Sequence, residues 1–382
     1  MSIDIFDVTI FLFAFGISCF LIVLTKYMPR LAGRSGDLSA VQAAHASITP
    51  RVGGVAIFGA IMFMSAFVPD IVASNYAKFL PAVGIIFFVG LCEDLGFRVS
   101  PWGRLTGAIV ASLFFIIASG VWMPRVDIPV LDGLMPYWFI GIPMTLFVTA
   151  GAANGFNLID GVNGLAGFSA IACAIGLAFL GAYGGYPEMS HLAVMIAAAI
   201  LGFLVMNYPF GLLFLGDAGA YTIGFVLSWF GISVILRAPE VSAWAVLLTL
   251  YWPVFDTLLA IFRRVSRRAP SFHPDRMHVH QLIMRSLEIV WLSRGRRNLS
   301  NPLSSLLLTP FILAPVAVGV LLWNRPLAAG LSFFGFLLLG FASYAALAKL
   351  PAKLRRSGKA VGRFSTGGSS GGSGDPLGIP GE

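Results

Sequence analysis

Five acids lie at or beside the ends of long apolar stretches in this 382-residue chain: Glu93, Asp94, Asp160, Asp217 and Asp256. Ionisable side chains are costly next to hydrocarbon, so such positions mark either function or a paired structural role. Hard carboxylate oxygens suit a divalent cation such as Mg²⁺, which completes its octahedron with waters and substrate phosphates. If the fold brings these ends together, the acids predict a site for a cation and a phosphate-bearing substrate.

The segment 154–167 (NGFNLIDGVNGLAG) carries a dense group of polar side chains. Asn154, Asn157 and Asp160 are three residues apart, which gives one polar stripe on a helical turn. The surrounding glycines let the backbone approach a ligand closely. An ordinary turn between two membrane helices would explain the glycines. It does not explain three polar side chains in so apolar a chain, so we favour a functional role.

The other acids each have a structural alternative. Neighbouring carboxylates at a helix C-terminus, Glu93 and Asp94, oppose the helix dipole, so a cation or an ion pair with Arg98 must compensate them. Asp217 precedes an apolar run and could cap its N-terminus, a role that does not exclude metal binding. For Asp256, two roles stay open: a part in the site, or an ion pair with Arg263 or Arg264.

A histidine-rich run, HPDRMHVHQLIMR, supplies three of the five histidines of the chain: His273, His278 and His280. Imidazoles near their ordinary pKa can bind phosphate or act as a general base, and Arg276 would add a guanidinium fork for phosphate. A zinc site would need further ligands. The structural alternative is a basic loop that faces anionic lipid.

The elements that must position these residues are membrane helices. Apolar residues make up 58% of the chain and charged residues only 11%, against about 25% charged in an ordinary soluble domain, which excludes a water-soluble enzyme. Continuous apolar stretches of about 20 residues fit helices that cross a bilayer. We predict an all-α integral membrane protein with eleven spans, near residues 8–25, 52–69, 79–93, 105–124, 137–154, 162–183, 191–207, 218–236, 241–262, 303–323 and 326–348.

The basic residues predict the orientation of these spans. With the N-terminus outside, 21 of the 25 Lys and Arg residues fall on the inner side, as the positive-inside rule requires, and the C-terminus is cytoplasmic. We expect one membrane domain at 1–348, with a cytoplasmic loop at 263–302. A tail at 349–382 is basic at first and then Gly/Ser-rich and disordered.

Six motifs in order resemble the polyprenyl-phosphate sugar-1-phosphate transferases, which form glycosyltransferase family 4. They are HASITPRVGG, GLCEDL, NGFNLIDGVNGLAG, NYPFGLLFLGDAGAYTIGF, WPVFDTLLAIFRR and HPDRMHVHQLIMR. The resemblance implies transfer of an N-acetylaminosugar-1-phosphate from a UDP-sugar to undecaprenyl phosphate, with release of UMP and with Mg²⁺, or Mn²⁺, as cofactor. It further implies the inner membrane of a bacterium, an active site on the cytoplasmic face and no nucleic-acid partner. A homodimer stays open.

The resemblance also implies roles for individual residues. Asp217 would be the principal Mg²⁺ ligand and Asn157 a second one. The residues implied as catalytic are Asp94, which deprotonates or positions the lipid phosphate, Asp160 and His278. The residues implied to bind substrate are Glu93, Asn163, Asn207, Phe214, Arg276 and His280, of which Asn207 and Phe214 would line the uridine pocket.

Four positions depart from the family pattern: Glu93 for Asp, Asn163 for Asp, Ala220 for Ser and Gln281 for His. They indicate a divergent member or an unusual sugar. The loop is closer to the branch that initiates O-antigen, common antigen or capsule than to the peptidoglycan branch. Two alternatives remain, a transporter or flippase with an intramembrane acid relay, and a non-catalytic scaffold for glycan assembly.

Overall fold

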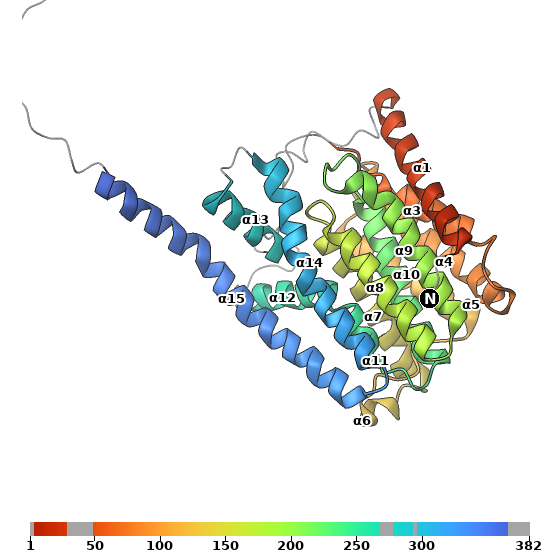
Figure 1. Ribbon diagram of the computed structural model, residues 1–382. Coiled ribbons are helices and arrows are strands. Elements are labelled where there is room, and N and C mark those ends of the chain that lie inside the picture. The colour runs from red at the N-terminus through yellow and green to blue at the C-terminus, as the bar shows by residue number, and fades with distance from the viewer. Residues whose placement is uncertain (1–3, 29–48, 268–277, 293–295, 366–382) are drawn as a thin grey trace, which may run out of the picture.

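The computed structural model describes residues 4–28, 49–267, 278–292 and 296–365, and all regular secondary structure in these ranges is helical (Figure 1). The helices are α1 (Ile5–Tyr27), α3 (Gly53–Met64), α4 (Asp70–Asp94), α5 (Pro101–Ser119), α6 (Pro129–Asp132), α7 (Trp138–Ile159), α8 (Leu165–Tyr183), α9 (Pro187–Asn207), α10 (Gly216–Arg237), α11 (Ala243–Thr249), α12 (Tyr251–Arg267), α13 (Val279–Val290), α14 (Arg297–Leu321) and α15 (Pro326–Ser365).

Within these ranges, nine helices are long and apolar enough to cross a membrane, or ten if α11 and α12 form one broken span. The chain is therefore a multi-pass all-α membrane protein, as predicted. A helix overlaps each of the eleven predicted spans, but α3 has only 12 residues and α11 meets α12 at an angle of 81°. The first third of α4 was missed, since this helix begins at Asp70 rather than near residue 79.

A proline explains the break between α11 and α12. Pro253 lies four residues after Thr249, the last residue of α11. It has no N–H for the Thr249 carbonyl, and its ring would clash with that carbonyl in a continuous helix. The chain turns at Leu250, and α12 leaves in a new direction.

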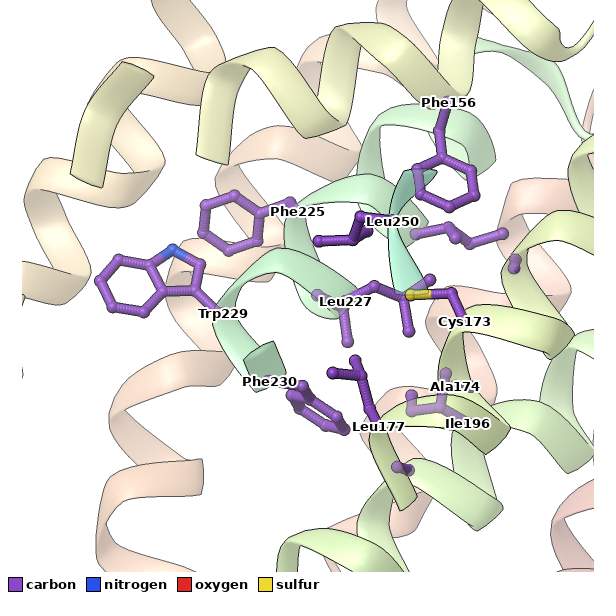
Figure 2. Packing of buried hydrophobic residues seen from close by; sticks show 14 of the residues in the cluster. Phe156, Cys173, Ala174, Leu177, Ile196, Phe225, Leu227, Trp229, Phe230 and Leu250 are labelled. Carbon is purple, nitrogen blue, oxygen red and sulfur yellow. The ribbon is translucent and has the colours of Figure 1, made fainter. Parts of the chain in front are cut away.

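Helix α10 forms the centre of the bundle. Of the 18 residues of α10 that would span the membrane, 89% are buried. The helix packs against α3, α4, α7 and α8. Figure 2 shows Phe225, Leu227, Trp229 and Phe230 of α10 among buried side chains of neighbouring helices. A helix that is apolar on every face is expected in such a position.

The long helix α15 lies at the outside of the bundle (Figure 1), where it contacts α11 and α13. Its backbone continues to Ser365, beyond the predicted end of the membrane domain at residue 348. The Gly/Ser-rich part of the predicted tail lies outside the described residues. The predicted loop at 263–302 contains the short helix α13, which lies between α12 and α14 in the sequence.

Candidate functional site

Asp217 lies between two arginines at the N-terminus of α10. Arg51 Nη2 donates to its Oδ1 at 3.0 Å, and Arg104 Nη1 donates to its Oδ2. The residue is only 3% exposed. It is the second residue of the helix rather than the N-cap, so the capping role considered from the sequence is not the one that the structure shows. These ion pairs join α10 to α5 and to the segment before α3.

The capping role belongs instead to Asp94, the last residue of α4. Its two oxygens accept hydrogen bonds from the backbone amides of Asp217 and Ala218, at 2.9 and 2.8 Å. A carboxylate is favourable at the positive end of the α10 dipole, and Arg51 lies 3.7 Å away. The N-terminus of α10 and Arg51 therefore compensate the negative charge of Asp94 at the C-terminus of α4.

Backbone hydrogen bonds hold Arg51 in this place. Phe214 N donates to the Pro50 carbonyl at 2.8 Å, and Gly53 N donates to the Phe214 carbonyl at 2.9 Å. The chain entering α3 thus runs beside the chain entering α10. A methyl group on Gly54 would lie 2.3 Å from Gly219 N, so the glycine lets the two backbones approach this closely.

Arg104 is positioned by the start of α5. Ser100 caps the helix by accepting a hydrogen bond from Gly103 N at 3.1 Å, and Pro101 follows at the first helical position, where its missing N–H costs nothing. Arg104 falls in the first turn, with its guanidinium 5.9 Å from the ring centre of Tyr221. Its buried Nε has no hydrogen-bond partner among the described residues.

Asp160 joins this group from the C-terminus of α7. The backbone amide of Gly216 donates to its carboxylate, and both Arg51 and Asp217 act on it electrostatically. Loss of contact with water raises the pKa of Asp160 to about 7, an effect that Arg51 opposes and Asp217 strengthens. Asp94, Asp160 and Asp217 therefore converge, as the sequence predicted.

Other predicted residues border the group. Glu93 lies near enough to Arg104 and Tyr221 to act on both electrostatically. The Tyr221 hydroxyl donates to Asn154 Oδ1 at 3.4 Å. Asn157 is partly exposed in the last turn of α7, one turn before Asp160.

Two of the predicted substrate-binding residues also bond to the protein itself. Asn163 Nδ2 donates to the Pro209 carbonyl at 2.9 Å, and the backbone N–H of Asn163 donates to Asn301 Oδ1 at 2.7 Å. The buried Oδ1 of Asn163 has no hydrogen-bond partner among the described residues. Asn207 accepts from Gly164 N at 2.7 Å and donates to the Leu213 carbonyl at 2.9 Å. These bonds fix the turn after Asp160 and the loop before α10.

The predicted histidines form a second, buried group. His278 and His280 are 3% and 2% exposed, and their rings stack with centres 5.6 Å apart. His278 Nδ1 lies 2.7 Å from Asp256 Oδ2. A methyl group on Gly161 would lie 2.3 Å from His280 Nε2, so this ring packs against the turn directly after Asp160. Arg276 and His273 lie outside the described residues.

Burial also determines the charge of His280. The pKa of this imidazole is lowered to about 3, chiefly by burial and also by the neighbouring His278 and Arg263, while Asp256 opposes the shift. The ring is therefore neutral at physiological pH. A neutral imidazole can still donate or accept one hydrogen bond at each nitrogen.

Comparison with known proteins relates part of the chain to a family. A model of the family described as glycosyl transferase family 4 matches residues 76–235, a range that contains Asp94, Asp160 and Asp217. This part of the chain is similar to glycosyl transferase family 4. The match does not reach Arg51, Asp256 or the predicted histidines.

This chain is similar to proteins named as N-acetylglucosaminyl 1-phosphate transferases in several bacteria. It is 28% identical to the "Probable undecaprenyl-phosphate N-acetylglucosaminyl 1-phosphate transferase" of Bacillus subtilis (strain 168) over 272 residues, 69% of this chain and 74% of the relative. It is 26% identical to the "Undecaprenyl-phosphate alpha-N-acetylglucosaminyl 1-phosphate transferase" of Escherichia coli (strain K12) over 253 residues, 63% of this chain and 67% of the relative. The protein of that same name from Salmonella typhi is 28% identical over 257 residues.

The side chains at this site fit a hard cation by their chemistry. Within the described ranges, no group of three or more His, Cys, Asp or Glu side chains could hold a metal ion. The oxygens of Asp217 and Asn157 would suit Mg²⁺ if substrate phosphates supplied further ligands, as is usual for this ion. Arg51 and Arg104 occupy both oxygens of Asp217.

Sequence reasoning missed these two arginines as site residues. Arg51 belongs to the motif HASITPRVGG and is one of the basic residues that predict the orientation, but the sequence predicts no site role for it. Arg104 had a clearer signal, because a lone arginine at the start of an apolar helix needs a partner. Neither partner could be named without the fold, since Asp217 is 166 residues from Arg51 and 113 from Arg104.

Proposed function

We propose that this protein transfers an N-acetylaminosugar-1-phosphate from a UDP-sugar to undecaprenyl phosphate and releases UMP. The observation that carries the proposal is the Asp217 carboxylate between Arg51 and Arg104, beside Asp94 and Asp160. Acids that bind a cation and arginines that bind phosphate are both needed to hold a nucleoside diphosphate. The names of the relatives supply the polyprenyl acceptor and the aminosugar class.

In the proposed reaction, an oxygen of the lipid phosphate attacks the β-phosphorus of the UDP-sugar. The bond from that phosphorus to the bridging oxygen breaks, and UMP leaves with the electron pair. Arg51 and Arg104 bind the non-bridging oxygens and stabilise the charge that builds on them. Mg²⁺, when bound at Asp217 with Asn157, would neutralise the diphosphate and polarise the phosphorus.

Asp94 and Asp160 have a positioning part in this scheme. A phosphate monoester has a second pKa near 6, so the lipid phosphate is largely ionised at pH 7 and needs little help from a base. Asp94 fixes the N-terminus of α10 and through it Asp217. Asp160 holds the other side of the group through Gly216 and faces Arg51.

The positions of the acids argue against the transporter alternative. An acid relay needs ionisable groups near the middle of the membrane. Asp94 ends α4, Asp160 follows α7, and Asp217 begins α10, so these acids lie at helix ends. The proposed setting is the cytoplasmic face of a bacterial inner membrane, where the reaction initiates a surface glycan such as O-antigen, common antigen or capsule.

UMP release from purified protein tests the proposal. The assay contains detergent-solubilised protein, undecaprenyl phosphate, Mg²⁺ and a series of UDP-aminosugars, with UDP-N-acetylglucosamine first because of the relatives' names. We expect release that requires both substrates and stops when the cation is chelated. Release from none of the sugars would reject the transferase and favour the scaffold or transporter.

Asp217→Asn tests the assignment of the metal ligand. We expect UMP release to fall more than about 100-fold, the scale seen when one group that stabilises developing charge is removed. Asp70→Asn is the matched control, since Asp70 is an exposed acid in the first turn of α4, at the opposite end of that helix from Asp94. Full activity of Asp217→Asn at saturating Mg²⁺ would show that this carboxylate does not bind the cation.

A further inference from the structure

Asp256 and His278 form a buried pair that the proposed function leaves unexplained. Asp256 lies on α12 beyond the bend, and His278 is the N-cap residue of α13. They are 1% and 3% exposed, and 2.7 Å separates Asp256 Oδ2 from His278 Nδ1. The pair thus joins two helices on either side of a segment that begins at residue 268.

The surroundings of the pair contain further titratable groups. The His280 ring stacks on that of His278 from one side, and the buried guanidinium of Arg263 acts electrostatically on Asp256. The second oxygen of Asp256 accepts no hydrogen bond from the described residues. Because His280 packs against Gly161, the whole group abuts the turn that carries Asp160.

Stability alone does not account for such a pair. Burying two ionisable groups costs solvation free energy that their mutual attraction only just offsets. Proteins in which apolar residues of similar size replace such a pair are often equally stable. What a carboxylate does for an imidazole is to fix its orientation, keep the proton on Nδ1 and stabilise the doubly protonated ring. In that ring Nε2–H is a donor, and the oxygens of a phosphate are acceptors.

We propose that Asp256 is a positioning residue, which holds Nδ1–H of His278 so that Nε2–H of the same ring donates to a phosphate oxygen of the substrate. The inference rests on the proposed transferase function and deepens it. It assigns to an acid outside the Asp217 group a part in binding the nucleotide diphosphate. Since Asp256 touches no substrate, its effect must pass through His278.

A double-mutant cycle tests that dependence. Asp256→Asn, His278→Gln and the double variant are compared with wild type for kcat and KM of the UDP-sugar. Removal of an orienting partner of this kind costs about 10- to 100-fold. We expect each single variant to lose activity on that scale and the double variant to be no worse than His278→Gln. Losses that multiply in the double variant would overturn the proposal, because they would show that Asp256 acts independently of His278.

The two Michaelis constants give a readout that a purely structural role would not change. A hydrogen bond from Nε2–H of His278 to a phosphate oxygen of the nucleotide helps to bind the UDP-sugar. We therefore expect Asp256→Asn to raise KM for the UDP-sugar and to leave KM for undecaprenyl phosphate unchanged. Equal rises in both KM values would overturn the proposal.

Controls separate folding from function. Thr257→Val changes the next residue of α12, whose hydroxyl bonds to the Pro253 carbonyl of the same helix, and it should keep wild-type kinetics. If Asp256→Asn fails to fold in detergent, Asp256→Glu keeps the carboxylate, and it should retain part of the activity. A folded Asp256→Glu with no more activity than His278→Gln would contradict the role of the carboxylate. Wild-type protein that releases no UMP would reject the proposed function and this inference together, whereas active wild type with multiplicative losses rejects the inference alone.

Discussion

At the residue scale, the carboxylates at the start of α10 already have partners. Asp217 is paired with two arginines, and Asp94 binds two amides of the same helix. Buried charges are tolerated only when they are paired in this way. In the proposed reaction, an anionic substrate would compete for the arginines, and a cation would take their place at Asp217.

Arg104→Gln tests whether this exchange takes place. A hydrogen bond to a charged group is worth about 1.5–3 kcal/mol, so we expect KM for the UDP-sugar to rise roughly 10- to 100-fold. Arg104→Lys keeps the charge but loses the planar fork, and it should fall between wild type and Gln. Steady-state kinetics of UMP release measure both effects.

The chain offers a matched control for this change. Arg125 is paired with Asp127 at the opposite end of the bundle, and its side chain is 22% exposed against 18% for Arg104. Arg125 also donates to the carbonyls of Pro239 and Val241. Arg125→Gln should lower stability without changing KM, and an equal rise in KM for both variants would rule out a specific role for Arg104.

His280 predicts how stability depends on pH. Its folded-state pKa is about 3 and its ordinary value is 6.5. Below pH 6.5 the unfolded chain gains a proton that the folded protein cannot accept, so folding weakens as the pH falls from 6.5 toward 3. By pH 5 the loss amounts to about 2 kcal/mol.

Thermal melts of His280→Gln measure this loss. The variant should be less sensitive than wild type to a change from pH 7 to pH 5, since glutamine does not titrate. All other groups are common to the two proteins. Equal losses of melting temperature would show that His280 takes up a proton in the folded state.

Residue types and spacing predicted part of this site. Carboxylates at helix ends are rare enough in an apolar chain to point to Asp94, Asp160 and Asp217 before the fold is known. The same reasoning could not show that Asn163 and Asn207 also bond to backbone carbonyls. Such bonds occur because a buried loop needs side chains to satisfy its backbone groups.

At the element scale, the site depends on how closely α4 and α10 cross. Asp94 reaches the amides of α10 because Gly90, one turn earlier, lets the helices touch. A methyl group on Gly90 would lie 2.5 Å from the Cα of Ala218. Backbone on the other side cannot move aside as a side chain could, so this position should tolerate no substitution.

Gly90→Ala and Gly84→Ala compare two glycines of the same helix. Overpacking typically costs about 1–3 kcal/mol, and here it would also push α10 and Asp217 away from Asp94. We therefore expect Gly90→Ala to lose both thermal stability and UMP release. Gly84 has open space around it, so Gly84→Ala should stay within about 1 kcal/mol of wild type. Similar melting temperatures for the two variants would mean that the crossing is not close-packed.

Hydrophobicity located the helices well but not their ends or bends. An apolar window is the same whether a helix is straight or broken, so 241–262 was expected to be one span. Pro253 was the available signal, since proline interrupts the hydrogen bond to the residue four before it. The start of α4 was missed because Asp70, Asn75 and Lys78 lower the hydropathy of its first turns.

At the scale of the whole molecule, the orientation in the membrane remains a prediction. It rests on the 21 basic residues that fall on one side when the N-terminus is outside. The Asp217 group lies on that same side, at the C-terminal end of α4 and the N-terminal end of α10. The arrangement would let a cytoplasmic nucleotide sugar reach the site.

Reporter fusions test this orientation. Green fluorescent protein fused after residue 382 should fluoresce, and alkaline phosphatase at the same place should be inactive, since both results mark the cytoplasm. An epitope placed before residue 1 should be accessible from outside in intact spheroplasts. Both ends on one side would instead require an even number of spans, such as the ten counted when α11 and α12 form one.

The sequence order of the Asp217 partners has a consequence for biosynthesis. Arg51, Asp94, Arg104 and Asp160 all precede Asp217 in the chain. Segments made first can fold first. When α10 is synthesised, the arginines that pair with Asp217 and the carboxylate of Asp94 that caps the helix are therefore already present. The acid of α10 need never enter the lipid alone, whereas a circularly permuted chain that begins with α10 would have to insert it without any of its partners.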